Sequence, residues 1–341
     1  MTATTVRSHT RSAVVLTLFL AAILAGGLYW HKHVMHVAGP HQDDAMLWVE
    51  SGDGHAVIRH KLDRLGVIHQ IYHYDAARLV ASDQFVPKAG EYLVPARASL
   101  SQIMAIIDQG YSYQRRLTVV EGVRSADVIT QLAANPFLRD DVAAMPDEGD
   151  LLPDTYFYTR GTARQAVVDR MQQARQISLA EAWIDRAPGL PYKTPQDALI
   201  MASIIEKEAA TTTDRGLVAA VLINRLKRSM RLQSDPTVLY ENAPTPDPLP
   251  VITKQDLQTR TPWNTYVITG LPATPICNPS LESLNAALHP PQSDFLYFVS
   301  DGDGGLRFAK TLDEHNRNVR LYRKHRDRSK AVPKSKPKQD R

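Results

Sequence analysis

The sequence predicts an α+β protein in which an apolar N-terminal helix precedes a small module of short strands and helices and a larger mixed α/β domain. Residues 13–30 carry no charge, short apolar stretches alternate with helical patterns over 46–115, and longer helical patterns occur within 116–320. The chain of 341 residues is 43% hydrophobic and 22% charged, which is the composition of a globular protein and excludes a wholly disordered chain.

The apolar segment 13–30 (AVVLTLFLAAILAGGLYW) is predicted to be a transmembrane helix, because its length is close to the minimum for crossing a bilayer. Arg7 and Arg11 lie before it, which favours a cytoplasmic N-terminal tail of residues 1–12 and places the rest of the chain across the membrane. A cleaved signal peptide is the alternative, but its apolar region is normally shorter and is followed by a clear small-residue cleavage site. We therefore expect an uncleaved single-pass anchor.

The stretch 31–45 is polar and rich in histidine, and it is predicted to be a linker. Its histidines could bind a metal ion, but no cysteine or carboxylate framework accompanies them in the sequence. We therefore expect solvated side chains and no metal site. The single cysteine, Cys277, cannot form a disulfide within the chain.

Residues 46–115 combine short strands with short helices. Helices are predicted at 54–66 and 99–110, because each stretch opens with a small residue, repeats apolar residues at helical spacing and closes with glycine. A strand is predicted at 91–94. Units of this size are common in sugar- and peptide-binding modules, but the pattern alone favours general α+β packing without a binding role.

The larger region opens with a strand-like stretch at 115–121 and helical patterns at 125–135 and 162–187. A β-hairpin is predicted at 294–310, where FLYFV and LRFAK flank the turn DGDGG. Residues 241–262, between these elements, are rich in proline and read as a loop.

A buried helix is predicted from residue 195 onward. Thr194 can cap it, Pro195 suits its first position and Asp197 lies in its first turn. The run ALIMASII that follows has no charge and belongs in a core. A second helix is predicted at 215–229, after the capping cluster TTTD.

The C-terminal segment 321–341 is rich in Lys, Arg, Pro and Ser, and we expect it to be a disordered basic tail. The net charge of the whole chain is only +4 and includes this tail, so the folded part is close to neutral. A nucleic-acid-binding domain would show a concentrated basic face, so no nucleic-acid partner is expected.

The apolar helix ends in Glu206-Lys207-Glu208, which raises the question of whether a glutamate there performs chemistry. The helix is apolar nearly all round, so at least one of the two glutamates is expected to be partly buried. Burial raises the pKa of a carboxyl group, which can then hold a proton near neutral pH and act as a general acid. The structural alternative is an ion pair between the glutamate and Arg225 or Arg231.

Three short stretches are dense in amides, carboxylates and aromatic residues, which suits a carbohydrate groove. Turn formation and local capping would explain the same residue types. The residues concerned are Glu148, Asp154, Thr155, Tyr156, Asn224, Arg225, Gln233, Asp235, Thr237, Trp263, Asn264, Thr265 and Tyr266.

Several of these stretches together resemble one protein family. The blocks KAGEY, EGDLLPDTYFY, ASIIEKEA, SDPTVLY, WNTYVITGLP and LYFVSDGDGGLRFAK occur in this order. They are similar to the endolytic murein transglycosylases, or YceG-like proteins, and the resemblance spans about residues 50–320.

The resemblance implies a LysM-like module at 46–115 and a catalytic domain at 116–320. It implies an enzyme in the cytoplasmic (inner) membrane, with a periplasmic catalytic domain, that cleaves peptidoglycan glycan strands internally and leaves 1,6-anhydro-N-acetylmuramic acid ends. The expected partners are the glycan strands and the membrane, with peptidoglycan synthases as further candidates. No cofactor is expected.

By position, the resemblance makes Glu206, the first glutamate of the EKE block, the catalytic residue. Protonated Glu206 would donate to the oxygen between N-acetylmuramic acid and N-acetylglucosamine, and would then take the proton of the C6 hydroxyl that attacks C1. Supporting, substrate-binding roles carry over to Glu208, Gln233, Asp235, Thr237, Asn264 and Tyr266. The sequence departs from the family pattern at Trp263, where Tyr is usual, and at Ala273-Thr274, where Pro-Gly is common.

Two other functions fit the same residues. A muramidase-type hydrolase would use the same acid together with a second carboxylate such as Asp235. A membrane-anchored glycan-binding scaffold would use Glu206 only as a structural residue.

Overall fold

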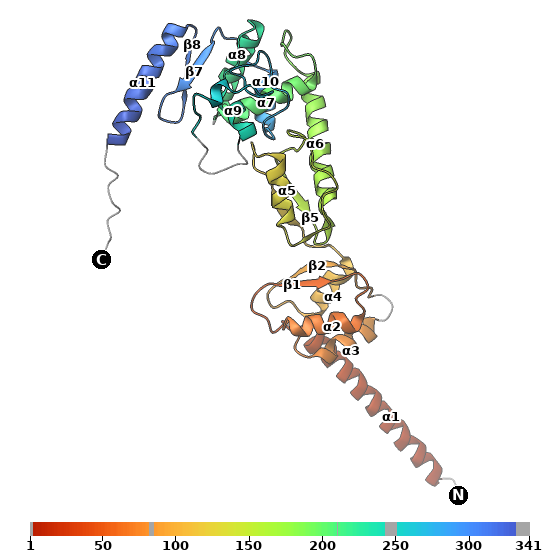
Figure 1. The fold of residues 1–341 in the computed structure, drawn as a ribbon. Helices are drawn as coiled ribbons and strands as arrows, with labels where there is room; N and C mark the ends of the chain where they lie inside the picture. Colours follow the sequence, from red (N-terminus) through yellow and green to blue (C-terminus); the bar gives the residue numbers. More distant parts are fainter. Residues whose placement is uncertain (1–2, 82–84, 210, 243–250, 332–341) are drawn as a thin grey trace. The chain divides into compact units, whose positions relative to one another are not determined.

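The computed structural model of the protein describes residues 3–81, 85–209, 211–242 and 251–331, and its fold is a helix-rich mixture of α and β structure. The α+β class expected from the sequence is thereby confirmed. The chain divides into two compact units (Figure 1). Unit 1 comprises Met1–Arg115 and Phe157–Arg160, and unit 2 comprises Arg116–Tyr156 and Gly161–Arg341.

The first element is the long helix α1 (Ala3–Trp30), which continues directly into a π-helix, η1 (His31–Met35). Val14–Met35 is long and apolar enough to cross a membrane, with a mean hydropathy of 1.8. This finding fits a membrane anchor and a signal sequence equally. The first part of the expected linker is helical, because Trp30 and Met35 pack against the core of unit 1.

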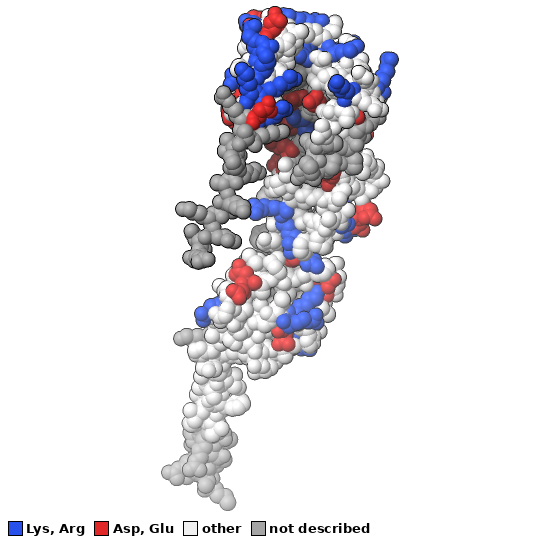
Figure 2. All heavy atoms as spheres, turned by 60° about the vertical axis from the view of Figure 1, so that its left-hand side comes forward, with Lys and Arg blue, Asp and Glu red and all other residues white. Residues whose placement is uncertain are grey.

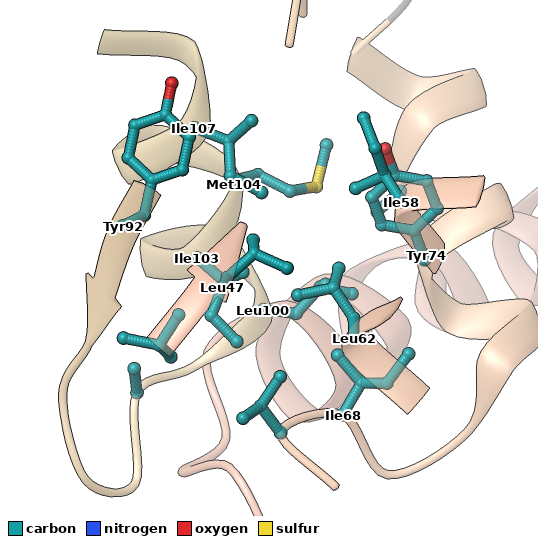
Figure 3. Close-up of a cluster of buried hydrophobic side chains, with 14 of the residues drawn as sticks. Leu47, Ile58, Leu62, Ile68, Tyr74, Tyr92, Leu100, Ile103, Met104 and Ile107 are labelled. Carbon is teal, nitrogen blue, oxygen red and sulfur yellow. The ribbon is translucent and has the colours of Figure 1, made fainter. Parts of the chain in front are cut away.

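Unit 1 is built on an antiparallel pair of strands, with Leu47 opposite Tyr92. Side chains from both strands and from the helices meet in one core, in which Leu47, Tyr74, Tyr92 and Ile103 are fully buried (Figure 3). The sequence predicted α2, β2 and α4 but neither β1 nor α3. The elements are β1 (Ala45–Val49), α2 (His55–Arg64), α3 (Ile71–Ala81), β2 (Gly90–Val94) and α4 (Leu100–Gln109).

Small sheets and two helices come next in the chain, and they belong to unit 2 except for Arg115 at the start of β3 and residues 157–158 at the end of β5. Strand β3 pairs with β5, and β4 pairs in parallel with β6. The elements are β3 (Arg115–Thr118), α5 (Ser125–Ala133), β4 (Leu138–Arg139), β5 (Thr155–Tyr158), β6 (Thr162–Ala163) and α6 (Arg164–Ile184).

The core of unit 2 is helical. Thr194 caps helix α7 as predicted, and the structure adds a capping box, in which the Thr194 and Asp197 side chains each bond to the other residue's backbone N–H. Helix α8 begins three residues earlier than predicted, at Thr212 rather than 215, because the Thr211 hydroxyl caps it by accepting from the Asp214 N–H at 3.1 Å. The elements are α7 (Pro195–Glu208), α8 (Thr212–Lys227), α9 (Asp235–Asn242), the 3₁₀ helix η3 (Asp256–Gln258) and α10 (Leu281–Leu288).

The C-terminal part of unit 2 is the predicted hairpin, β7 (Tyr297–Ser300) and β8 (Leu306–Ala309), followed by α11 (Leu312–Ala331). Helix α11 packs on both strands and continues to Ala331, so residues 321–331 are helical where disorder was expected. The remainder of the expected tail, 332–341, and the loop segment 243–250 lie outside the described residues. Figure 2 shows Lys and Arg side chains concentrated on the face of unit 2 that is turned toward the viewer.

Candidate active site

Two glutamates end helix α7 and point in different directions. The helix is held by its capped N-terminus and by complete burial of Ala198–Ile205. Because an α-helix turns about 100° per residue, Glu206 and Glu208 project about 200° apart. Each glutamate therefore meets a different set of neighbours.

Glu206 is held by the start of α10 and by Arg215. Its Oε2 accepts hydrogen bonds from the Ser280 N–H at 2.8 Å and from the Ser280 hydroxyl, and its Oε1 accepts one from Arg215 Nη2 at 3.2 Å. The side chain is 5% exposed. Burial raises the pKa of Glu206, but the hydrogen bonds from Ser280 and the charge of Arg215 outweigh it, so the pKa lies below its ordinary value.

The expectation that Glu206 keeps its proton at neutral pH is therefore wrong. The carboxylate is stabilised by donors from Ser280, 74 residues further along the chain, which no helix pattern reveals. Its ion-pair partner is Arg215, and not Arg225 or Arg231 as the structural alternative supposed.

Glu208 has the property that was expected of Glu206. It is half-buried, and its Oε1 accepts a hydrogen bond from the Ser234 hydroxyl at 2.6 Å. Burial raises its pKa to about 7, the charge of Asp235 adds to the rise, and Ser234 and Arg225 oppose it. A carboxyl group with this pKa is poised to donate and accept a proton near neutral pH.

Glu208 also lines a pocket of about 580 Å³, a size typical of ligand sites. Three other predicted site residues, Gln233, Asp235 and Tyr266, line the same pocket, whereas Glu206 is not among its described lining residues. The Tyr266 hydroxyl donates to Asp235 Oδ1 at 2.6 Å. The structure thus brings three of the predicted residues together with Glu208 at one pocket.

Gln233 occupies this pocket in a strained backbone conformation. Its φ of 53° lies in the left-handed region, which is costly for a residue other than glycine. Its N–H donates to the Thr265 carbonyl at 3.1 Å, and Arg225 Nη1 lies 3.4 Å from its side-chain oxygen. These contacts hold the amide at the pocket.

Thr237 and Asn264 lie behind the pocket, where both side chains are buried. The Thr237 hydroxyl donates to the Ser234 carbonyl at 2.6 Å. The Asn264 amide donates to the Asp256 and Thr259 carbonyls, and its oxygen accepts from the Tyr266 N–H at 3.0 Å. These hydrogen bonds hold Ser234 and Tyr266 in place, and neither Thr237 nor Asn264 is among the described lining residues of the pocket.

The two departures from the family pattern contact each other. The Trp263 indole N–H donates to the Thr274 hydroxyl at 2.9 Å. The larger aromatic residue therefore has a polar partner for its N–H, which is the usual requirement of a half-buried tryptophan.

Sequence reasoning missed one whole side of the pocket. That side is formed by residues of the hairpin and of α11, namely Tyr297, Phe298, Val299, Ser300, Leu306, Leu312 and His315. The hairpin was visible as a strand pattern, but nothing in the pattern indicated that it would face Glu208. Among the described residues, no group of three or more His, Cys, Asp or Glu side chains is placed to hold a metal ion.

Comparisons with known proteins identify one family. The profile of the YceG-like family matches residues 47–321. Over 245 residues the chain is 34% identical to an endolytic murein transglycosylase of Bacillus subtilis (strain 168), covering 69% of this chain and 65% of that protein. It is 27% identical over 369 residues to an endolytic murein transglycosylase of Streptococcus pneumoniae serotype 2 (strain D39 / NCTC 7466), covering 92% of this chain and 65% of that protein.

A solved structure is similar as well. The crystal structure of a yceG-like protein from Listeria monocytogenes matches with a TM-score of 0.51 and 29% sequence identity, covering 81% of this chain and 98% of that chain. The match to each of the two transglycosylases spans 65% of the relative's own length.

Proposed function

Since the chain belongs to the YceG-like family, we propose that it is a lytic transglycosylase that cleaves peptidoglycan glycan strands internally and leaves 1,6-anhydro-N-acetylmuramic acid ends. The names of the two relatives support the reaction class. The observation that carries the proposal is a half-buried carboxyl group, Glu208, with a pKa of about 7 in a pocket of ligand size.

Glu208, rather than Glu206, is the general acid in this proposal. Both end the same helix, but Glu206 is an ion-paired carboxylate with a lowered pKa, and a group that has already lost its proton cannot donate one. Glu208 retains a large protonated fraction near neutral pH and lines the pocket. Glu206 instead fixes the end of α7 to the start of α10 through Ser280.

The proposed reaction uses one carboxyl group twice. Glu208 donates its proton to the oxygen that links N-acetylmuramic acid to N-acetylglucosamine, and this C–O bond breaks as positive charge develops at C1. The resulting carboxylate then takes the proton of the C6 hydroxyl of the same muramic acid, whose oxygen bonds to C1. Glu208 ends protonated, and no water is consumed.

Asp235 has two roles in this scheme. Its negative charge favours the protonated form of Glu208, and at the pocket it faces the positive charge that develops at C1. Tyr266 holds it in place by a hydrogen bond. The rival role is that of a second catalytic carboxylate in a hydrolase, which would give reducing ends instead of anhydro ends.

We also propose that α1 is an uncleaved anchor in the cytoplasmic membrane, with the N-terminus in the cytoplasm and the catalytic part in the periplasm. The apolar stretch Val14–Met35 supports this placement. Glycan strands would be the substrate, and peptidoglycan synthases would be partners at the same membrane face. Residues 46–115 would form the LysM-like module and 116–320 the catalytic domain.

Product analysis tests the proposal. Isolated peptidoglycan is digested with the wild type, Glu208→Gln and Glu206→Gln, and the soluble products are identified by mass spectrometry. The wild type and Glu206→Gln should release anhydro-ended fragments, and Glu208→Gln should release none. Reducing ends would support the hydrolase, and the absence of products from the wild type would support a non-catalytic scaffold.

A further inference from the structure

The pocket beside Glu208 has two chemically different sides. One side carries the carboxyl, amide and hydroxyl groups of Glu208, Gln233, Asp235 and Tyr266. The opposite side is made by the hairpin and the first turns of α11. We call its five larger side chains, Tyr297, Phe298, Leu306, Leu312 and His315, the aromatic wall; Val299 and Ser300 of the hairpin also line the pocket.

The aromatic wall is held rigidly against the carboxyl side. The rings of Tyr297 and His315 stack with centroids 5.3 Å apart and an angle of 27°. The Arg225 guanidinium lies 5.1 Å from the centre of the Tyr297 ring and donates to the Leu296 carbonyl at 2.6 Å. The same guanidinium donates to the Leu232 carbonyl at 2.8 Å, next to Gln233, so one side chain connects both sides of the pocket.

The wall carries no charge at neutral pH. Burial and the nearby charge of Arg225 lower the pKa of His315, which keeps its imidazole neutral. The other four members are aromatic or aliphatic. The five wall side chains are uncharged, whereas Glu208, Asp235 and Arg225 bring ionisable groups to the same pocket, so the pocket suits a ligand with one apolar and one polar side.

Leu312 is the most accessible part of the wall, with 55% of its surface exposed. An exposed leucine is not informative by itself, because scattered apolar residues are normal on protein surfaces. Leu321 on the same helix is 50% exposed and is not among the lining residues. The two leucines have similar exposure and lie on the same helix, but only Leu312 lines the pocket. Leu321 is therefore a matched control for substitutions at Leu312.

We propose that the aromatic wall binds one sugar ring of the glycan strand, adjacent to the bond that Glu208 protonates. This inference rests on the proposed function. A pyranose ring has an apolar C–H face and a hydroxylated edge, so one ring satisfies the wall and the groups of Gln233 and Asp235 at the same time.

The wall is tested with Leu312→Ser and its control, Leu321→Ser. Cleavage is measured on intact peptidoglycan fragments and on soluble glycan strands whose stem peptides have been removed with an amidase. Leu312→Ser should raise KM roughly fivefold to tenfold on both substrates, because an apolar contact of this size contributes on that order to affinity. It should leave kcat and the alkaline limb of the pH profile unchanged, and Leu321→Ser should match the wild type throughout.

Two outcomes would overturn the inference. Wild-type KM values for Leu312→Ser on both substrates would show that the wall does not contact substrate, and an effect confined to peptide-bearing fragments would assign the wall to the stem peptide. Binding of the stripped strands to Glu208→Gln, with and without Leu312→Ser, separates this test from the proposed function. If the wild type proves inactive, weaker binding by the double variant would still support the sugar site, and equal binding would contradict it.

Discussion

The replacement of glutamate by glutamine should have opposite effects on stability at the two ends of the EKE block. Glu206→Gln removes the negative charge that faces Arg215 at 3.2 Å, where the two side chains are 5% and 13% exposed. A charged hydrogen bond in a buried site contributes about 1.5–3 kcal/mol. The free energy of unfolding should fall by about this amount, while folded Glu206→Gln retains cleavage.

Glu208→Gln should stabilise the protein at neutral and alkaline pH. The pKa of Glu208 is about 7 in the folded protein, against an ordinary value of 4.5. Below pH 4.5 the group is protonated in both states, and between pH 4.5 and 7 only the unfolded chain releases the proton, so stability falls as the pH rises. The full difference corresponds to about 3 kcal/mol. Glutamine avoids this loss and still accepts the hydrogen bond from Ser234.

Two measurements test this. The unfolding of unit 2 by denaturant is measured for the wild type, Glu206→Gln and Glu208→Gln at pH 4 and at pH 8. The cleavage activity of each protein is then expressed per folded molecule. At pH 8 the order of stability should be Glu208→Gln, wild type, Glu206→Gln, and at pH 4 Glu208→Gln should match the wild type. Full cleavage by Glu208→Gln would refute the reasoning. A folded but inactive Glu206→Gln would return the catalytic role to Glu206.

Three further predictions follow from the same contacts. Asp235→Asn removes a charge that raises the pKa of Glu208, so the alkaline limb of the activity profile should move to lower pH, as measured by pH-rate curves. Thr237→Val leaves the buried Ser234 carbonyl without its hydroxyl donor, which should lower the free energy of unfolding by about 1–3 kcal/mol with little change in KM. Denaturant titration beside steady-state kinetics checks this, and a raised KM with unchanged stability would contradict it. If Val14–Met35 is an uncleaved anchor, the full chain should sediment with membranes and be released by detergent but not by salt.

Local patterns were sufficient to predict several elements of the fold. Thr194, Pro195 and the apolar run after them predicted the start of α7, because caps and first-turn residues act over three or four positions. The hairpin 294–310 was predicted in the same way, from two apolar strands around a glycine-rich turn. The helical part of 321–331 was missed because its packing partners, the strands β7 and β8, are not visible in a charged, apolar-poor stretch.

For the candidate site, the sequence indicated some of the residues that line one pocket, but not the whole lining and not what each residue does. Gln233, Asp235 and Tyr266 come together with Glu208 at the pocket, whereas Thr237 and Asn264, of similar chemistry, are buried behind it. Short-range patterns cannot separate these cases, since a threonine that binds substrate and one that supports a turn occupy the same kinds of sequence.

By itself, the sequence determined the family, the apolar helix with its two terminal carboxyl groups and the expectation that one of them is a buried acid. Only the tertiary structure decided which one. The N-terminus of α10 and Arg215 approach Glu206 and stabilise its charge, while the pocket beside the hairpin leaves Glu208 with few donors and an adjacent Asp235. A pKa depends on the charges and dipoles within a few ångströms, and these come from segments far apart in the chain.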